Sequence, residues 1–166
     1  MRMSGYNVST STFDVKGSNT TIDVGDEEEI IWEFEISVSN VNNKDSLFQS
    51  IRLKQNGSAD QDNLENVKLY NSSDEVVSTE TVIDGEYFTF ILWEGLAVEG
   101  GDDERYIVKG DIVSGDDADT IIFQLDAKFD LAVTEEGTGF GEQVTITPAN
   151  GNLRTCTLNA GKFTVS

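Results

Sequence analysis

The chain has 166 residues, of which 11 are Lys or Arg and 31 are Asp or Glu, so its formal net charge is −20. This length predicts one module over residues 1–166 with a sizeable core, and the charge excludes nucleic acid as a partner, because phosphate binding needs a basic surface. No apolar run reaches the roughly 18 residues that a membrane helix needs, so membrane insertion is not expected.

Strict alternation of apolar and polar residues marks the first strong strand, at 29–38. One face carries Ile30, Trp32, Phe34, Ile36 and Val38, and the other carries Ile31, Glu33, Glu35 and Ser37. A period of two predicts a half-buried strand with Trp32 in the core. The same pattern predicts strands at 46–55 and 64–70, with a short helical turn at 61–65.

The second half of the chain repeats the pattern between turn signals. A short strand begins at 76–77, and Asp84-Gly85 between two apolar runs predicts a hairpin. The strand at 86–93 has apolar residues on both faces, so we expect it to be covered on both sides, with Trp93 partly exposed at its end. Further strands are predicted at 105–113 and 120–128, around Val144 and Ile146, and around Leu153, Leu158, Phe163 and Val165. The turn spacing is typical of an all-β sandwich.

Several stretches resemble a known family. They are Ser-Thr-Phe-Asp-Val at 11–15, the run 57–71, Tyr-Ile-Val-Lys-Gly-Asp-Ile at 106–112, Asp-Thr-Ile-Ile-Phe-Gln-Leu at 119–125, and Gly-Phe-Gly at 139–141. Together they resemble the immunoglobulin-like repeats of long bacterial surface proteins of the surface-layer and adhesin type. The resemblance implies an immunoglobulin-like antiparallel β-sandwich of Greek-key type, display outside the cell, tandem connection and no catalytic residues.

The two ends of the chain are similar to each other. Gly-Tyr-Asn-Val-Ser at 5–9 resembles Gly-Lys-Phe-Thr-Val-Ser at 161–166. We therefore expect residues 161–166, or residues 4–8, to pair with a neighbouring module or to lead into it, because a strand from another copy can complete an open sheet edge. Met1 is followed by polar sequence without an apolar leader, which suits either a piece of a longer protein or a virion protein.

Catalytic chemistry has little support in the sequence. There is no His, which excludes Ser-His-Asp triads and His-ligated zinc. The single Cys156 is expected to be a buried apolar residue, and the glycines at 137–141 indicate a tight turn rather than a phosphate-binding loop. No catalytic residue is assigned, and we do not expect an enzyme.

Calcium is the one cofactor that the sequence suggests, because acidic loops supply the oxygen ligands that it prefers. Three loops are candidates: Asp60, Asp62 and Asn63; Asp102 and Asp103, followed by Glu104; and Asp116, Asp117 and Asp119. The alternative is that these residues are solvated turns, with Asp60 and Asp62 capping the local backbone.

Three interpretations of function remain open. The first is a non-catalytic structural or adhesive module, extracellular or on the cell surface, which assembles with copies of itself or with neighbouring domains in a surface layer, adhesin or filament. The second is a virion surface protein, as a capsid decoration or fibre domain. The third is a calcium-dependent or carbohydrate-binding module, whose glycan would stack on an aromatic residue such as Trp32, Trp93, Tyr70, Tyr87 or Tyr106.

Overall fold

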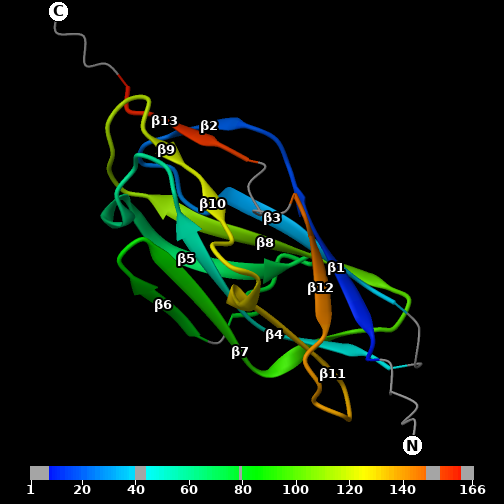
Figure 1. The fold of residues 1–166 in the computed structure, drawn as a ribbon. Helices are drawn as coiled ribbons and strands as arrows, with labels where there is room; N and C mark the ends of the chain where they lie inside the picture. The colour runs from blue at the N-terminus through cyan, green and yellow to red at the C-terminus, as the bar shows by residue number, and fades with distance from the viewer. Residues whose placement is uncertain (1–7, 40–43, 79, 149–153, 162–166) are drawn as a thin grey trace, which may run out of the picture.

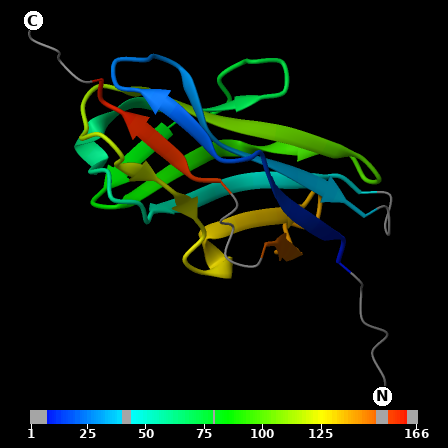
Figure 2. The same ribbon diagram turned by 90° about the horizontal axis from the view of Figure 1, so that it is seen from above.

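A computed structural model describes residues 8–39, 44–78, 80–148 and 154–161. Strands form two main sheets that lie face to face and a smaller sheet at one end (Figures 1 and 2). The first sheet has the order β12 (Gln143–Thr147), β1 (Thr10–Lys16), β3 (Glu29–Val38), β8 (Asp103–Ile112) and β5 (Leu64–Asn71). The second has the order β10 (Phe123–Gln124), β4 (Ser46–Gln55), β7 (Tyr87–Val98) and β6 (Glu80–Asp84), and β11 (Leu131–Glu135) also pairs with β4. The small sheet contains β2 (Thr20–Asp23), β13 (Cys156–Asn159) and β9 (Thr120–Ile121), and η1 (Gln61–Asn63) and η2 (Lys128–Asp130) are single 3-10 turns.

The connections cross repeatedly between the two main sheets. The chain passes from β3 to β4, back to β5, and later from β7 to β8, changing sheet each time. The all-β sandwich that the alternation and turn spacing predicted is confirmed, and its crossing connections are of the Greek-key type that the resemblance implied. Among the described strands the pairings are antiparallel except for two, in which β1 lies parallel to β12 and β2 lies parallel to β13. These two pairings place the first strands of the chain beside the last ones.

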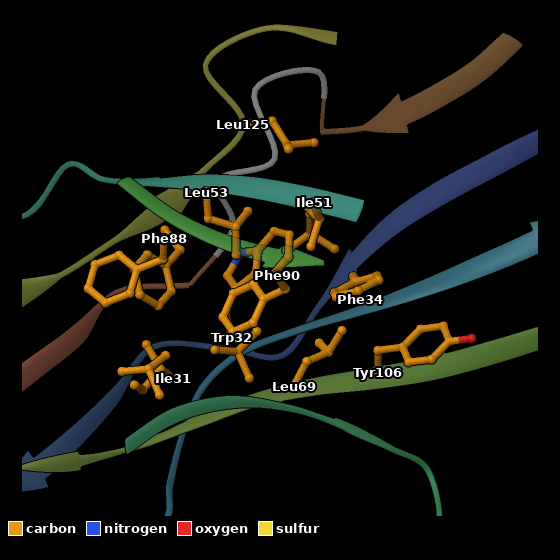
Figure 3. Close-up of a cluster of buried hydrophobic side chains, with 14 of the residues drawn as sticks. Ile31, Trp32, Phe34, Ile51, Leu53, Leu69, Phe88, Phe90, Tyr106 and Leu125 are labelled. Atoms are coloured by element: carbon orange, nitrogen blue, oxygen red, sulfur yellow. The ribbon is translucent and has the colours of Figure 1, made fainter. Parts of the chain in front are cut away.

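Aromatic side chains from both sheets fill the space between them (Figure 3). The ring centroids of Phe34 on β3 and Phe48 on β4 are 5.7 Å apart, and those of Phe48 and Tyr106 on β8 are 5.2 Å apart. Trp32 is fully buried, as predicted. Burial of each such side chain contributes roughly 2–3 kcal/mol from lost apolar surface, so this cluster is the main source of stability.

A bulge in β3 corrects one detail of the prediction. Alternation placed Ile31 on the outer face, but Ile31 is buried, because the β3–β8 register shifts between Ile30 and Trp32. The extra residue turns Ile31 toward Gly110, where a Cβ atom would lie only 3.0 Å from the Ile31 Cδ1 atom and 3.0 Å from the Val67 Cγ2 atom. The missing side chain of Gly110 therefore makes room for the bulged isoleucine.

The predicted strand at 120–128 is interrupted. It forms β9 and β10 separately, because the side-chain oxygen of the buried Gln55 accepts a hydrogen bond from the Ile122 backbone N–H at 2.7 Å. The predicted strands at 29–38 and 46–55 coincide with β3 and β4, and the hairpin at Asp84-Gly85 joins β6 to β7. Strands β1, β2 and β11 were not predicted.

Some predictions fall on residues that the structure leaves undescribed. These are the terminal segments at 4–7 and 162–166, and Leu153. Cys156 is buried, as expected.

None of the described helical segments has the length and apolar character to cross a membrane.

Candidate functional site

The outer face of the β4–β7–β6 sheet is the most distinctive surface of the described chain. Residues that alternate with the buried Ile51, Leu53, Phe88 and Phe90 point away from the core. The strand register sets Lys54 opposite Tyr87, and it sets Arg52, Thr89 and Val82 in one row across the three strands, which lie side by side in Figure 1. We call Arg52, Lys54, Val82, Tyr87, Ile91 and Trp93 the partner face.

The prediction that this part of β7 is covered on both sides is wrong. Tyr87 and Ile91 are only partly buried and Trp93 is 64% exposed, because no further sheet covers the partner face among the described residues. The expectation that Trp93 is exposed is confirmed. An aromatic side chain exposed to this extent on a sheet face is available for contact with a partner.

Arg52 and Tyr87 form the centre of the partner face. The Arg52 guanidinium carbon lies 3.8 Å from the centroid of the Tyr87 ring, which is a cation–π contact. The Tyr87 hydroxyl donates a hydrogen bond to Asp126 at 2.9 Å, and this bond, followed by partial desolvation, raises the pKa of Tyr87 above its ordinary value. Arg52 also forms an ion pair with the buried Asp130 at 3.7 Å. Both side chains are therefore held in place by the loop between β10 and β11.

A wide bulge in β7 presents Trp93. Ser50 pairs with Ile91 while Phe48 pairs with Leu96, so the segment 92–95 stands against Gln49 alone. The bulge requires positive φ angles of 69° at Glu94 and 76° at Gly95. A positive φ at a residue other than glycine costs about 1 kcal/mol or more, and such strain is common at functional sites.

Gly95 cannot be replaced without disturbing that bulge. A Cβ atom there would lie 2.9 Å from the Gln49 side-chain nitrogen and 3.0 Å from the Leu47 Cβ atom. The sequence Trp-Glu-Gly was the one available signal for this feature, since glycine after an exposed aromatic residue often marks a strained bulge.

The opposite outer face of the sandwich has a different character. Its charged residues pair with each other: Lys16 with Glu35 at 3.7 Å, and both Arg105 and Arg154 with Glu33. Glu33 is buried, and two arginines match its charge, whereas the partner face combines two aromatic residues with two cations.

Two of the three predicted calcium loops meet. Ser58, Asp60 and Asn63 line one side of an open hollow of about 370 Å³, and Gly115, Asp116 and Asp119 line the other. The Ser58 hydroxyl donates a hydrogen bond to Asp119 at 2.9 Å and so links the two loops. The third loop lies apart, because Asp102 and Asp103 stand at the opposite end of β8 and both are exposed.

Several of these oxygens already accept local hydrogen bonds. Asp60 accepts from the Asp62 N–H at 3.0 Å, as the capping alternative predicted, and Asp119 accepts from the Asp116 N–H at 3.0 Å. Asp117 does not line the hollow, and it accepts from the Ala160 N–H at 3.3 Å. Within the ranges that the structure describes, no three acidic or Cys side chains are grouped as a metal site, so a cation here would also need amide, hydroxyl or carbonyl oxygens.

The remaining aromatic candidates for glycan stacking lie inside the protein. Trp32, Tyr70 and Tyr106 are buried, which leaves Tyr87 and Trp93 at the surface. Both lie on β7, on the same face of the sheet.

The sequence matches no family model and no curated protein. Its fold is similar to that of cohesin modules. The seventh ScaB type I cohesin from Pseudobacteroides cellulosolvens is 14% identical with a TM-score of 0.45, and the match covers 95% of this chain and 97% of that one. The third ScaC cohesin from Acetivibrio cellulolyticus, solved in complex with the ScaB dockerin, is 11% identical with a TM-score of 0.48 and coverage of 91% and 99%. A non-cellulosomal cohesin from Archaeoglobus fulgidus is 13% identical with a TM-score of 0.39 and coverage of 92% of both chains. Scores this low assign neither a partner nor a site to the present chain.

Proposed function

We propose that this chain is a non-catalytic structural or adhesive module of an extracellular surface assembly, and that it binds another copy of itself or a neighbouring module through the partner face. The observation that carries the proposal is the Arg52–Tyr87 stack, which lies on the same open sheet face as the exposed Trp93.

The composition of the partner face supports protein binding. Trp, Tyr and Arg are the residues most enriched among those that dominate binding energy in protein interfaces. Asp126 and Asp130 hold Tyr87 and Arg52 before any partner arrives. Pre-organised side chains lose less entropy on binding, so more of the contact energy appears as affinity.

The chemistry of the face favours binding over catalysis. The chain contains no His, and the hydroxyl of Tyr87 has a raised pKa, which makes it a poorer base or nucleophile at neutral pH. Within the partner face, the polar groups are arranged to hold the aromatic ring and the guanidinium, rather than to polarise a substrate.

Sedimentation velocity tests self-assembly directly. We expect the wild-type chain to associate with rising concentration, and we expect Trp93→Ala to weaken that association about tenfold or more, as loss of a central aromatic contact usually does. Phe129→Ala is the matched control, because Phe129 is 84% exposed on η2 but lies outside the partner face.

Cross-linking on the native surface tests a neighbouring module as partner. A photoreactive phenylalanine analogue in place of Trp93 should yield an adduct with a structural surface protein, and the same analogue at position 129 should not. A capsid protein in that adduct would favour the virion alternative. A chain that is monomeric at every concentration and gives equal adducts from both positions would contradict the proposal.

Calcium binding is a second candidate function. It is favoured by the hollow at which Asp60 and Asn63 approach Asp116 and Asp119, loops that are more than fifty residues apart in the sequence. An ion bound there would link these two loops at one end of the sandwich, and a melting experiment for it is given in the Discussion.

A further inference from the structure

The chain covers two of its sheet edges with its own return segments. Along β5, the Asn71 N–H donates to the Glu75 carbonyl at 2.9 Å and the Val77 N–H donates to the Leu69 carbonyl at 2.9 Å. Along β11, the Glu142 N–H donates to the Val133 carbonyl at 2.8 Å. These bonds occupy backbone groups that an open edge would offer to another strand.

The edge strand β6 has no such cover among the described residues. It pairs with β7 on one side only, in an unbroken register from Glu80 opposite Ile91 to Asp84 opposite Tyr87. Val82 and Ile83 in its middle are 42% and 45% exposed. Two exposed aliphatic residues on a regular edge strand are unusual in a solvated protein.

The middle of β6 lacks several of the usual protections of an edge strand. Residues 80–84 read Glu-Thr-Val-Ile-Asp, without Lys or Pro, and the pairing with β7 contains no bulge. By contrast, the edge strand β12 exposes Gln143, Thr145 and Thr147 and is followed by Pro148, the single proline of the chain. The regular backbone and aliphatic centre of β6 therefore suit the addition of another strand.

Charge selects which strand can be added. The turn after β6 exposes the carboxylates of Asp84 and Glu86, in a chain whose net charge is −20. An antiparallel β6 from a second copy, centred on Val82, would set the acidic residues that end each strand opposite one another, and like charges directly opposite are destabilising. A strand with basic ends would instead form favourable cross-strand pairs.

We propose that β6 is a docking edge for an extended segment of another protein, with alternating β-branched residues flanked by Lys or Arg. The added strand would continue the β4–β7–β6 sheet by main-chain hydrogen bonds, and its β-branched side chains would contact Val82 on one face and Ile83 on the other. Its basic end beside the turn would meet Asp84 and Glu86. This inference does not rest on the Arg52–Tyr87 stack or on Trp93, although Val82 belongs to the partner face as well.

A synthetic peptide tests the proposal on the whole chain. The probe is acetyl-Lys-Thr-Val-Thr-Val-Thr-Lys-amide, compared with the same peptide carrying Glu at both ends and with one that is N-methylated at alternate backbone nitrogens. NMR should show slowed amide exchange and shifted signals in residues 80–84 with the basic peptide, and affinity should fall about tenfold or more with either comparison peptide, since each removes cross-strand pairs or main-chain bonds.

Variants separate this edge from the partner face. Ile83→Lys should abolish peptide binding while the β7 signals and the melting temperature stay close to wild type, and Trp93→Ala should leave peptide binding unchanged. The proposal is overturned if the peptide shifts signals only outside residues 80–84, if the N-methylated peptide binds equally well, or if Ile83→Lys instead breaks a dimer of the chain.

Discussion

The guanidinium carbon of Arg52 on β4 lies 3.8 Å from the centre of the Tyr87 ring on β7, although the two residues are not directly opposite in the strand register. Arg52 therefore reaches diagonally across the sheet, and the same guanidinium pairs with Asp130, a carboxylate that is only 7% exposed. We expect Arg52→Ala to lower the free energy of unfolding by about 1–2 kcal/mol, because it removes the cation–π contact and leaves a buried carboxylate without its cation. Urea unfolding measures this loss.

Lys54→Ala is the control for that measurement. The Lys54 ammonium lies 5.9 Å from the same ring, at the limit of a cation–π contact. Its removal should therefore cost less than about 0.5 kcal/mol. Equal losses from the two variants would show that Arg52 stabilises the fold only as one more surface cation.

The close approach of Gly57 to β9 gives a second prediction. A Cβ atom at Gly57 would lie 2.1 Å from the Thr120 carbonyl oxygen, a distance that requires the backbone to move. We expect Gly57→Ala to destabilise the protein by about 2 kcal/mol or more in urea unfolding. Gly141→Ala should be nearly neutral, because an added Cβ there has open space and no positive φ to oppose it. A neutral Gly57→Ala would mean that the 57–59 loop adapts freely.

The sandwich could be predicted from the sequence because its central strands alternate strictly. In β3, the period of two alone placed Trp32 and Phe34 in the core. The bulge at Ile31 could not be predicted, since it depends on the space at Gly110, a residue of a different strand. Strand β11 escaped prediction because its five residues offer little alternation to detect.

The candidate site was predictable only in part. Trp93 was expected to be exposed, but its place on the same sheet face as the Arg52–Tyr87 stack depends on the pairing of β4 with β7, which local patterns do not specify. The acidic loops at 60–63 and 116–119 were recognised separately. Their meeting depends on the hydrogen bond between Ser58 and Asp119, a contact between distant parts of the chain.

The buried Cys156 predicts a loss of stability in alkaline solution. Burial raises the pKa of its thiol above the ordinary value, and the nearby Arg154 opposes this shift. In the unfolded chain the thiol has a pKa of about 8.5. Above that pH, ionisation of the thiol stabilises the unfolded state but not the folded state, in which the thiol stays neutral. The contribution of the neutral Cys156 thiol to stability is thus complete below its pKa in the unfolded chain, and it is lost as pH rises through its pKa in the folded protein.

Cys156→Ala identifies that contribution. Between about pH 8 and about pH 10, the free energy of unfolding should fall more steeply in wild type than in the variant, by up to about 1.4 kcal/mol per pH unit at the limit. The decline should persist in part, because burial also raises the pKa of Tyr106. Parallel pH profiles for the two proteins would show that the thiol does not control alkaline stability.

Calcium gives the last prediction, at the hollow between Asp60 and Asp116. An ion bound only by the folded chain stabilises it by mass action, so calcium at about ten times its dissociation constant should add about 1.4 kcal/mol and raise the melting temperature relative to chelator. Asp116→Asn should reduce that rise, because it removes a carboxylate charge from the hollow without removing the Ser58–Asp119 hydrogen bond. Asp102→Asn at the far end of β8 removes the same charge from the molecule, and it should leave the calcium response intact. Magnesium at equal ionic strength should give a smaller rise, since it gives up its water ligands reluctantly. An equal response of both variants, or of both ions, would mean that divalent cations act only by screening the charge of −20.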